Sequence, residues 1–230
     1  NTLIRQNFNA ETIHIPESLK EFVSFTRLVD MIDFSRVSFD KALRTSAVKN
    51  IEIESKYPLV ILNDCVETLG GLWTGKKPPF IKVSVIRNTN FTMKGELKLD
   101  DVAQIDVEEN SFAKRKLQKG DIIIEKSGGS ETQAVGRVVL FNLDNGDFAY
   151  SNFTARLRIV NKNLIPNYLH LILNKIYQDG LTFNYQNGSS GLKNLDLERY
   201  LTIKIPLPSL TIQNQIVSEC EKVDEEYNIS

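Results

Sequence analysis

The sequence predicts an α+β fold: a mixed, mainly antiparallel sheet with a packed helix, followed by a protruding, coiled-coil-like C-terminal helix. Short runs of alternating apolar and polar residues, typical of half-buried strands, fill the middle of the chain. Two later segments, 166–179 and 209–230, place apolar residues at steps of three and four, as amphipathic helices do. The 230 residues are 41% hydrophobic and 25% charged, which is ordinary for a globular chain.

Three parts are expected along the chain. Residues 1–50 are predicted to form an N-terminal helical arm, or the tail of a preceding domain, because apolar residues after Pro16 follow a rough helical spacing. The composition changes at Lys56-Tyr57-Pro58, so residues 51–208 are expected to form the main domain. Residues 209–230 are expected to form a separate helix.

Strands of the main domain are expected where β-branched and aromatic residues gather. These stretches are residues 59–62, 80–87, 122–124, 138–141, 148–159 and 200–205. Within residues 80–87, Ile81, Val83 and Val85 alternate with polar positions and predict one buried face. The only tryptophan, Trp73, follows the Gly70-Gly71 turn and is expected in the core, with a stacking platform as the alternative.

The stretch from Lys119 to Phe141, KGDIIIEKSGGSETQAVGRVVLF, predicts two strands joined by a long polar loop. The loop is too long for a tight hairpin turn, and loops held by buried strands often contain binding residues. Its charged and amide donors, together with Gly128-Gly129, favour a binding loop. A solvated hairpin loop is the alternative.

The charges are unevenly distributed, although the net charge is only −1. Residues 70–140 hold 12 Lys and Arg against 9 Asp and Glu, and residues 151–210 hold 7 against 3. Residues 211–230 hold 1 against 5. A basic middle and an acidic tail indicate two surfaces with different partners.

The two cysteines, Cys65 and Cys220, have neither a disulfide pattern nor a metal-binding spacing, and the two histidines lie far apart. Neither a metal nor a cofactor is therefore expected. No apolar run approaches the length of a membrane span and no signal peptide is visible, so a cytoplasmic protein without a membrane partner is expected.

The two predicted helices differ in their apolar faces. The first begins at Pro166, has a broad apolar face and stops at Gly180. The second has a narrow seam with steps of 4, 4, 3 and 4 residues, formed by Ile212, Ile216, Cys220, Val223 and Tyr227. A narrow seam of this kind indicates pairing with another helix.

The order of these features resembles the target recognition domain of type I restriction–modification specificity subunits, over about residues 55–230. The most specific part is Ile205-Pro206-Leu207-Pro208 followed by Gln213 and Ile216-Val217, which looks like the family's junction between recognition domain and spacer helix. The family's usual Gly-Gly near the start appears as Gly70-Gly71. Such domains also occur fused to N6-adenine methyltransferases, and residues 1–50 would fit the end of such an enzyme.

The resemblance implies a module that recognises one half of a split duplex DNA sequence and directs a partner adenine methyltransferase subunit and, through the complex, a restriction subunit. It also implies that the C-terminal helix packs against another helix, which makes a homodimer possible. A full specificity subunit usually has two domains and two helices. A half-subunit, a fragment and a fused single-chain enzyme therefore stay open, and a protein-interaction scaffold that does not bind DNA is the competing hypothesis.

Catalysis by the chain itself is not expected. Adenine methyltransferases use an Asn, Asp or Ser before Pro-Pro-aromatic, whose side chain accepts a hydrogen bond from the adenine amine. In Lys77-Pro78-Pro79-Phe80 the first residue is a lysine, which has donors only. Glu54-Ser55-Lys56 has a nuclease-like spacing but lacks an upstream aspartate, so a solvated strand start is the better interpretation.

The candidate DNA-binding residues are those with cationic, amide or hydroxyl side chains on the predicted loops. Lysine and arginine would hold phosphates, and the others would read base edges in the major groove. These candidates are Lys76, Lys77, Asn88, Asn90, Lys126, Ser127, Ser130, Gln133, Arg137, Asn152, Thr154, Ser189, Ser190 and Lys193.

Overall fold

The computed structural model describes residues 16–17, 53–75, 77–130, 133–187 and 192–229, without the side chains of residues 225 and 227–229. The chain divides into two compact units, residues 1–49 and residues 50–230, and nearly all described residues belong to the second unit. The predicted helical arm lies outside the described residues, and so do the candidates Lys76, Ser189 and Ser190. Among the described residues, no helix is both long and apolar enough to cross a bilayer.

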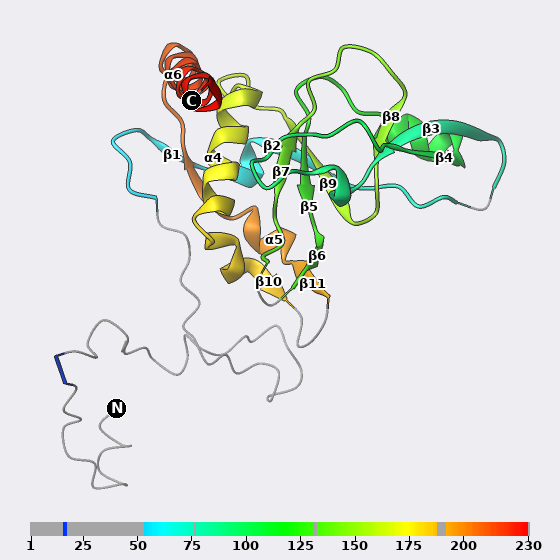
Figure 1. Ribbon diagram of the computed structural model, residues 1–230, viewed down its shortest axis with the longest axis horizontal. Helices are drawn as coiled ribbons and strands as arrows, with labels where there is room; N and C mark the ends of the chain where they lie inside the picture. The colour runs from blue at the N-terminus through cyan, green and yellow to red at the C-terminus, as the bar shows by residue number, and fades with distance from the viewer. Residues whose placement is uncertain (1–15, 18–52, 76, 131–132, 188–191, 230) are drawn as a thin grey trace, which may run out of the picture. The chain divides into compact units, whose positions relative to one another are not determined.

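The centre of the fold is a four-stranded antiparallel sheet in the order β2-β9-β5-β7 (Figure 1). Its strands are β2 (Val66–Gly70), β9 (Thr154–Ile159), β5 (Ile122–Glu125) and β7 (Val138–Leu140). Strand β5 is buried on both faces, because Ile122 and Ile124 enter one apolar cluster and Ile123 enters another. A strand covered on both faces has a continuous apolar run, as the sequence shows here.

Helix α4 (Pro166–Gln178) packs on one face of this sheet, with proline in its first turn and Gly180 just beyond its end. Its buried side chains, including Leu169 and Leu173, join Ile122 and Ile124 in the largest cluster. The predicted helix at this position, with its apolar face on the sheet, is confirmed. Three short elements follow: η5 (Leu181–Tyr185), β10 (Gln186–Asn187) and α5 (Leu197–Tyr200).

A second sheet has the order β4-β3-β8. It consists of β3 (Phe80–Ile86), β4 (Ala103–Glu108) and β8 (Phe148–Tyr150), and the pairing of β3 with β8 is parallel. Helix α3 (Glu109–Arg115) places Phe112 against Val83 and Val85, which confirms that these alternating positions face a core.

Two smaller sheets and two short 3₁₀ helices complete the second unit as described. Strand β1 (Leu59–Ile61) pairs with β12 (Lys204–Pro206), and β11 (Lys193–Leu195) lies between β10 and β6 (Ser127–Gly129). The 3₁₀ helices are η3 (Leu62–Asp64) and η4 (Asn88–Asn90). The fold is therefore α+β as predicted, with several mainly antiparallel sheets and four α-helices among the described residues.

Two local predictions are wrong. Residues 200–205 do not form one strand, because Asp196 accepts a hydrogen bond from the Arg199 amide and caps α5, so that only Lys204–Pro206 is extended. Trp73 is not in the core, since 74% of its surface is exposed. Its chain neighbour Leu72 is buried instead.

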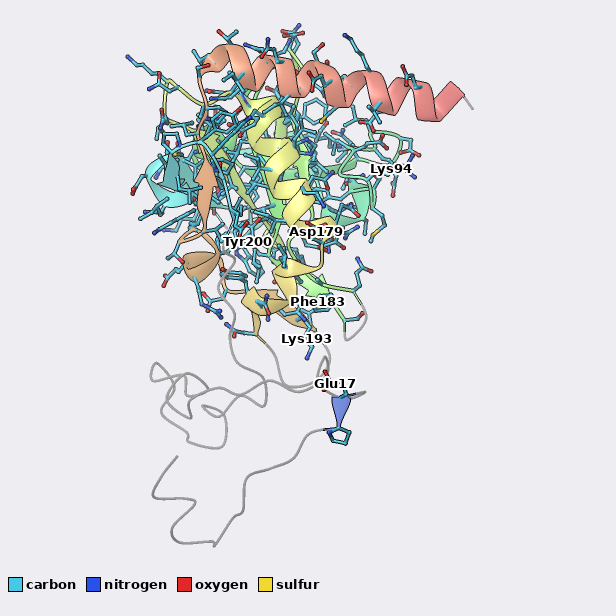
Figure 2. All side chains as sticks on the ribbon, turned by 90° about the vertical axis from the view of Figure 1, so that its left-hand side faces the viewer. Glu17, Lys94, Asp179, Phe183, Lys193 and Tyr200 are labelled. Atoms are coloured by element: carbon cyan, nitrogen blue, oxygen red, sulfur yellow. The ribbon has the colours of Figure 1, made fainter. Side chains whose placement is uncertain are left out.

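Helix α6 (Leu210–Ile229) begins against the domain and continues past it (Figure 2). Gln213 and Val217 are buried, and Ile216 packs against the largest cluster. The first turns therefore pack on the domain, contrary to the prediction that the whole helix projects away from it. Val223, two turns later, is 63% exposed.

Candidate nucleic-acid interface

Most of the predicted binding residues lie at one end of the central sheet, where β2 and β5 end and where β7 and β9 begin. We call this the loop end. The long loop after β5, the turn before β9 and the segment after β2 all leave the sheet there. Strands β6 and β11 lie beyond the end of β5 (Figure 1). Antiparallel pairing thus brings together segments that lie far apart in the sequence.

Backbone hydrogen bonds hold these segments to one another. The amides of Lys126 and Ser127 both donate to the Phe153 carbonyl, at 2.8 and 3.1 Å. The Leu195 amide donates to the Lys126 carbonyl at 2.7 Å, and the Gly71 amide donates to the Thr154 carbonyl at 3.1 Å. The backbone at the start of each loop is therefore fixed by partners from other segments.

Gly71 shows how closely these segments approach. A Cβ atom at this position would lie 1.9 Å from the Ser151 carbonyl oxygen, far inside van der Waals contact. The next residue, Leu72, forms an isolated parallel bridge with Ser151, and its amide donates to the Tyr150 carbonyl at 2.8 Å. Glycine is required here because the two backbones touch.

A buried ionic network lies beneath the loop end. The Glu125 carboxylate is fully buried and accepts two hydrogen bonds from the Arg137 guanidinium, at 2.9 and 2.8 Å. The same guanidinium donates to the carbonyls of Asn88 and Phe91, at 3.2 and 3.0 Å. The hydrogen bonds to Glu125 raise the pKa of Arg137 above its ordinary value, against the opposing effect of burial.

Asn88 connects this network to the loop. Its side-chain amide donates to Glu125 Oε1 and to the Ser127 carbonyl, both at 3.2 Å. The Ser127 hydroxyl in turn donates to Asn194 Oδ1. Hydrogen bonds through Asn88 and Arg137 thus connect the Glu125 carboxylate to both ends of the long loop and to the turn after β3. Such a network positions the exposed side chains around it.

The cations of the described residues fall into two groups. The first group is held by internal partners: Arg137 pairs with Glu125, Arg156 with Glu67, and Arg158 with Asp121. Arg115 belongs to this group too, because its Nε donates to the Gly70 carbonyl at 2.8 Å. By contrast, no carboxylate among the described residues pairs with the ammonium of Lys77 or of Lys126. Lysines without an internal partner are the residues available to a phosphate.

The structure gathers some candidates and separates others. Those at the loop end are Asn88, Lys126, Ser127, Ser130, Gln133, Arg137, Asn152, Thr154 and Lys193. Lys77 lies by the opposite end of β3, where its amide donates to Glu108 Oε1 at 2.6 Å. Asn90 is 2% exposed. Its side chain accepts a hydrogen bond from the Arg87 amide and donates one to the Asp101 carbonyl. The buried Thr154 hydroxyl donates to the Ser151 carbonyl.

Sequence reasoning missed three residues of the loop end: the buried Glu125, Asn194 and the exposed Phe153. Trp73, expected in the core with a stacking platform as the alternative, is exposed. Residues 148–159 were expected to form one strand, but a turn precedes Thr154 and 42% of the surface of Phe153 is exposed. No group of three or more His, Cys, Asp or Glu side chains within the described part of the chain is arranged to hold a metal ion.

Comparisons with known proteins bear on the fold and the family of the chain. The chain shares its fold with a chain from a study of complex assembly and conformational transition of the type I R-M system, at 14% identity and a TM-score of 0.50. Alignments with the HsdS subunit from Thermoanaerobacter tengcongensis and the S subunit from M. genitalium give 15% and 12% identity and TM-scores of 0.48 and 0.46.

Each alignment covers 76% of this chain, but only 40%, 39% and 41% of the solved chains, so this chain spans about two fifths of their length. A search of curated proteins found no match. The model of the type I restriction modification DNA specificity domain matches residues 69–229. That match confirms the resemblance drawn from the sequence, and the chain belongs to the type I restriction modification DNA specificity domain family.

Proposed function

We propose that residues 50–230 recognise one half of a split duplex DNA sequence through the loop end of the central sheet. The observation that supports this most strongly is the convergence there of polar loops from four parts of the chain, in a member of a DNA specificity family. The chain would act as the non-catalytic specificity component and direct a partner methyltransferase.

The candidate side chains divide into contact and positioning roles under this proposal. Lys126 and Lys77 would hold phosphates, because neither ammonium is paired with a carboxylate of the described residues. Gln133 and Asn152 would face base edges, where amide groups can read the major groove, and Lys193 would hold a phosphate. The Ser127 hydroxyl donates to Asn194 Oδ1 and would offer its acceptor lone pairs to a base edge. Arg137, Asn90 and Thr154 have internal hydrogen bonds, so we assign them the role of positioning the loops.

Lys77 can belong to the same interface although it lies at the other end of β3. That strand has seven residues and spans roughly 23 Å at about 3.3 Å per residue. A duplex laid along the second sheet would cover this distance with about seven base pairs. We therefore infer a phosphate contact at each end of β3.

Replacing Lys126 or Lys77 with alanine is expected to weaken duplex binding and to reduce the slope of log affinity against log salt by about 0.9 for each phosphate that is no longer neutralised. Titrations of the full chain with duplex DNA at several salt concentrations measure this slope. Lys162→Ala is the matched control, because Lys162 is exposed in the turn that follows the far end of β9.

An unchanged slope in a folded Lys126→Ala variant would exclude a phosphate contact by this lysine. If the wild-type chain bound no duplex at all in moderate salt, the scaffold hypothesis would replace DNA recognition.

We further propose that α6 pairs with an equivalent helix, from a second copy or from another domain, and that it docks the methyltransferase. Val223 supports this proposal, since it is an exposed aliphatic side chain on the predicted seam. Ile212, Ile216 and Cys220, earlier on the seam, are partly buried, and the side chain of Tyr227 lies outside the described residues. Pairing would begin where the contact with the domain ends.

Val223→Glu is expected to convert a self-paired chain to a monomer that still folds, because it places a charged side chain from each helix in the apolar seam. Sedimentation at tens of micromolar measures the change. Lys222→Glu places a glutamate on the neighbouring exposed residue, off the seam. It changes the net charge by two units instead of one and is still expected to leave the assembly intact. A wild-type chain that is already monomeric would show that the helix awaits a different chain or domain.

A further inference from the structure

Trp73 is an exposed side chain that directly follows a hydrogen-bonded stretch of backbone. It is the only tryptophan of the chain, and 74% of its surface is exposed. Immediately before it, Gly71 and Leu72 are hydrogen-bonded to the carbonyls of Thr154 and Tyr150. Four residues after it, the Lys77 amide is bonded to Glu108 Oε1. Among the described residues, this is the large hydrophobic side chain with the greatest exposed fraction.

The surroundings of Trp73 are suited to a nucleic acid. The segment passes the turn that contains Phe153, a second exposed ring. Two cations flank the start of the same segment: the Lys126 ammonium would lie 3.7 Å from a Cβ atom on Gly70, and Arg115 donates to the Gly70 carbonyl. Aromatic faces beside cations bind nucleobases by stacking while the cations hold the backbone.

An indole can stack only on a base face that is uncovered. In a regular duplex every base face is covered by its neighbours, so stacking requires that one base step opens or that one base leaves the stack. The hydrogen bonds of Gly71 and Leu72 hold the backbone that leads into Trp73, so ordering the indole on a base costs less backbone entropy than it would on an unanchored loop. Trp73 is therefore suited to take the place of the neighbouring base at such a step.

We propose that Trp73 stacks on a nucleobase that binding separates from its neighbour, so that this domain distorts its DNA site as well as reading it. This inference rests on the proposed DNA recognition and adds a defined deformation of the duplex. The expected loss on Trp73→Ala is about 5- to 100-fold in affinity, which is the range for removal of one stacked aromatic residue. Trp73→Phe retains an aromatic face and is expected to keep most of the affinity.

The fluorescence of the single tryptophan provides a direct test. A duplex selected by the full chain from a randomised pool is titrated into wild-type protein. Stacking is expected to quench the indole emission and to shield it from acrylamide. In the same duplex, 2-aminopurine placed at one adenine after another is expected to change its emission at one position with wild type and much less with Trp73→Ala. Val160→Ala truncates another exposed apolar residue, just beyond the far end of β9, and should change neither signal nor affinity.

Two different failures can be told apart. If the chain binds the selected duplex but saturation leaves the indole emission unchanged, and Trp73→Ala binds within twofold of wild type, the stacking inference is wrong and DNA recognition stands. If neither wild type nor Trp73→Phe binds any duplex, the proposed function itself is wrong.

Discussion

Replacing Glu125 with alanine is expected to destabilise the domain by about 3–5 kcal/mol, the range for removing one partner of a buried ion pair. The carboxylate is fully buried and Arg137 is 12% exposed, so the guanidinium would lose its counter-charge in a region with little water. Asn88 would also lose one of its two acceptors. The turn after β3 and both ends of the long loop would be released together.

Denaturant unfolding measures this effect, and the surface pair Arg87–Asp101 is the matched control. Asp101 is 89% exposed in that pair, so Asp101→Ala is expected to cost less than about 1 kcal/mol. Glu125→Gln keeps the size of the side chain and one acceptor oxygen. Its free energy of unfolding should therefore lie between those of Glu125→Ala and of wild type. A loss below about 1 kcal/mol for Glu125→Ala would show that the network does not hold the loop end together.

Gln213→Ala is expected to destabilise the domain by roughly 2–4 kcal/mol, because it removes the partner of three backbone groups in one buried and two partly buried hydrogen bonds. The Gln213 side chain is fully buried. Its amide donates to the carbonyls of Asn163 and Pro208, at 2.6 and 2.9 Å, and its carbonyl accepts from the Ile165 amide at 3.0 Å. One side chain thus joins the start of α6 to the start of α4.

Gln215→Ala is the control for this change, since Gln215 is exposed two residues along the same helix and should tolerate alanine within about 0.5 kcal/mol. Equal stability of the two variants in denaturant unfolding would contradict the role assigned to Gln213. Limited proteolysis adds a second measurement, because loosening of α6 should expose its first turn to cleavage in Gln213→Ala alone.

The elements that could be predicted are those whose signals are local. The triple isoleucine of β5 and the helix between Pro166 and Gly180 depend on nearby patterns, and both occur as expected. Strand β4 was not predicted, although Ala103, Ile105 and Val107 alternate with polar residues as in a half-buried strand. Helix α3 gave a weak signal, because only Phe112 of its seven residues is buried.

The site was harder to predict than the fold, because its chemistry depends on contacts between distant residues. The loop after β5 was correctly expected between two strands, but the pairing of Arg137 with Glu125 is visible only after folding buries both side chains. Gln213 entered the sequence argument as part of a family pattern, and the structure supplies its physical reason. Trp73 was misplaced because residue type alone does not reveal that Leu72 fills the core position beside it.

The two ends of β9 have a consequence for how this protein could change over time. The partners of Gln213 belong to the start of α4 and the link before α6, whereas the contacts of Lys126 and Gly71 surround the first residue of β9. Six strand residues, roughly 20 Å, separate these regions. Mutations, insertions or recombination that reshape the loops leave the attachment of α6 untouched. Under the proposed function, a lineage could acquire a new DNA target through changes in the loops without changing how α6 is attached to the domain.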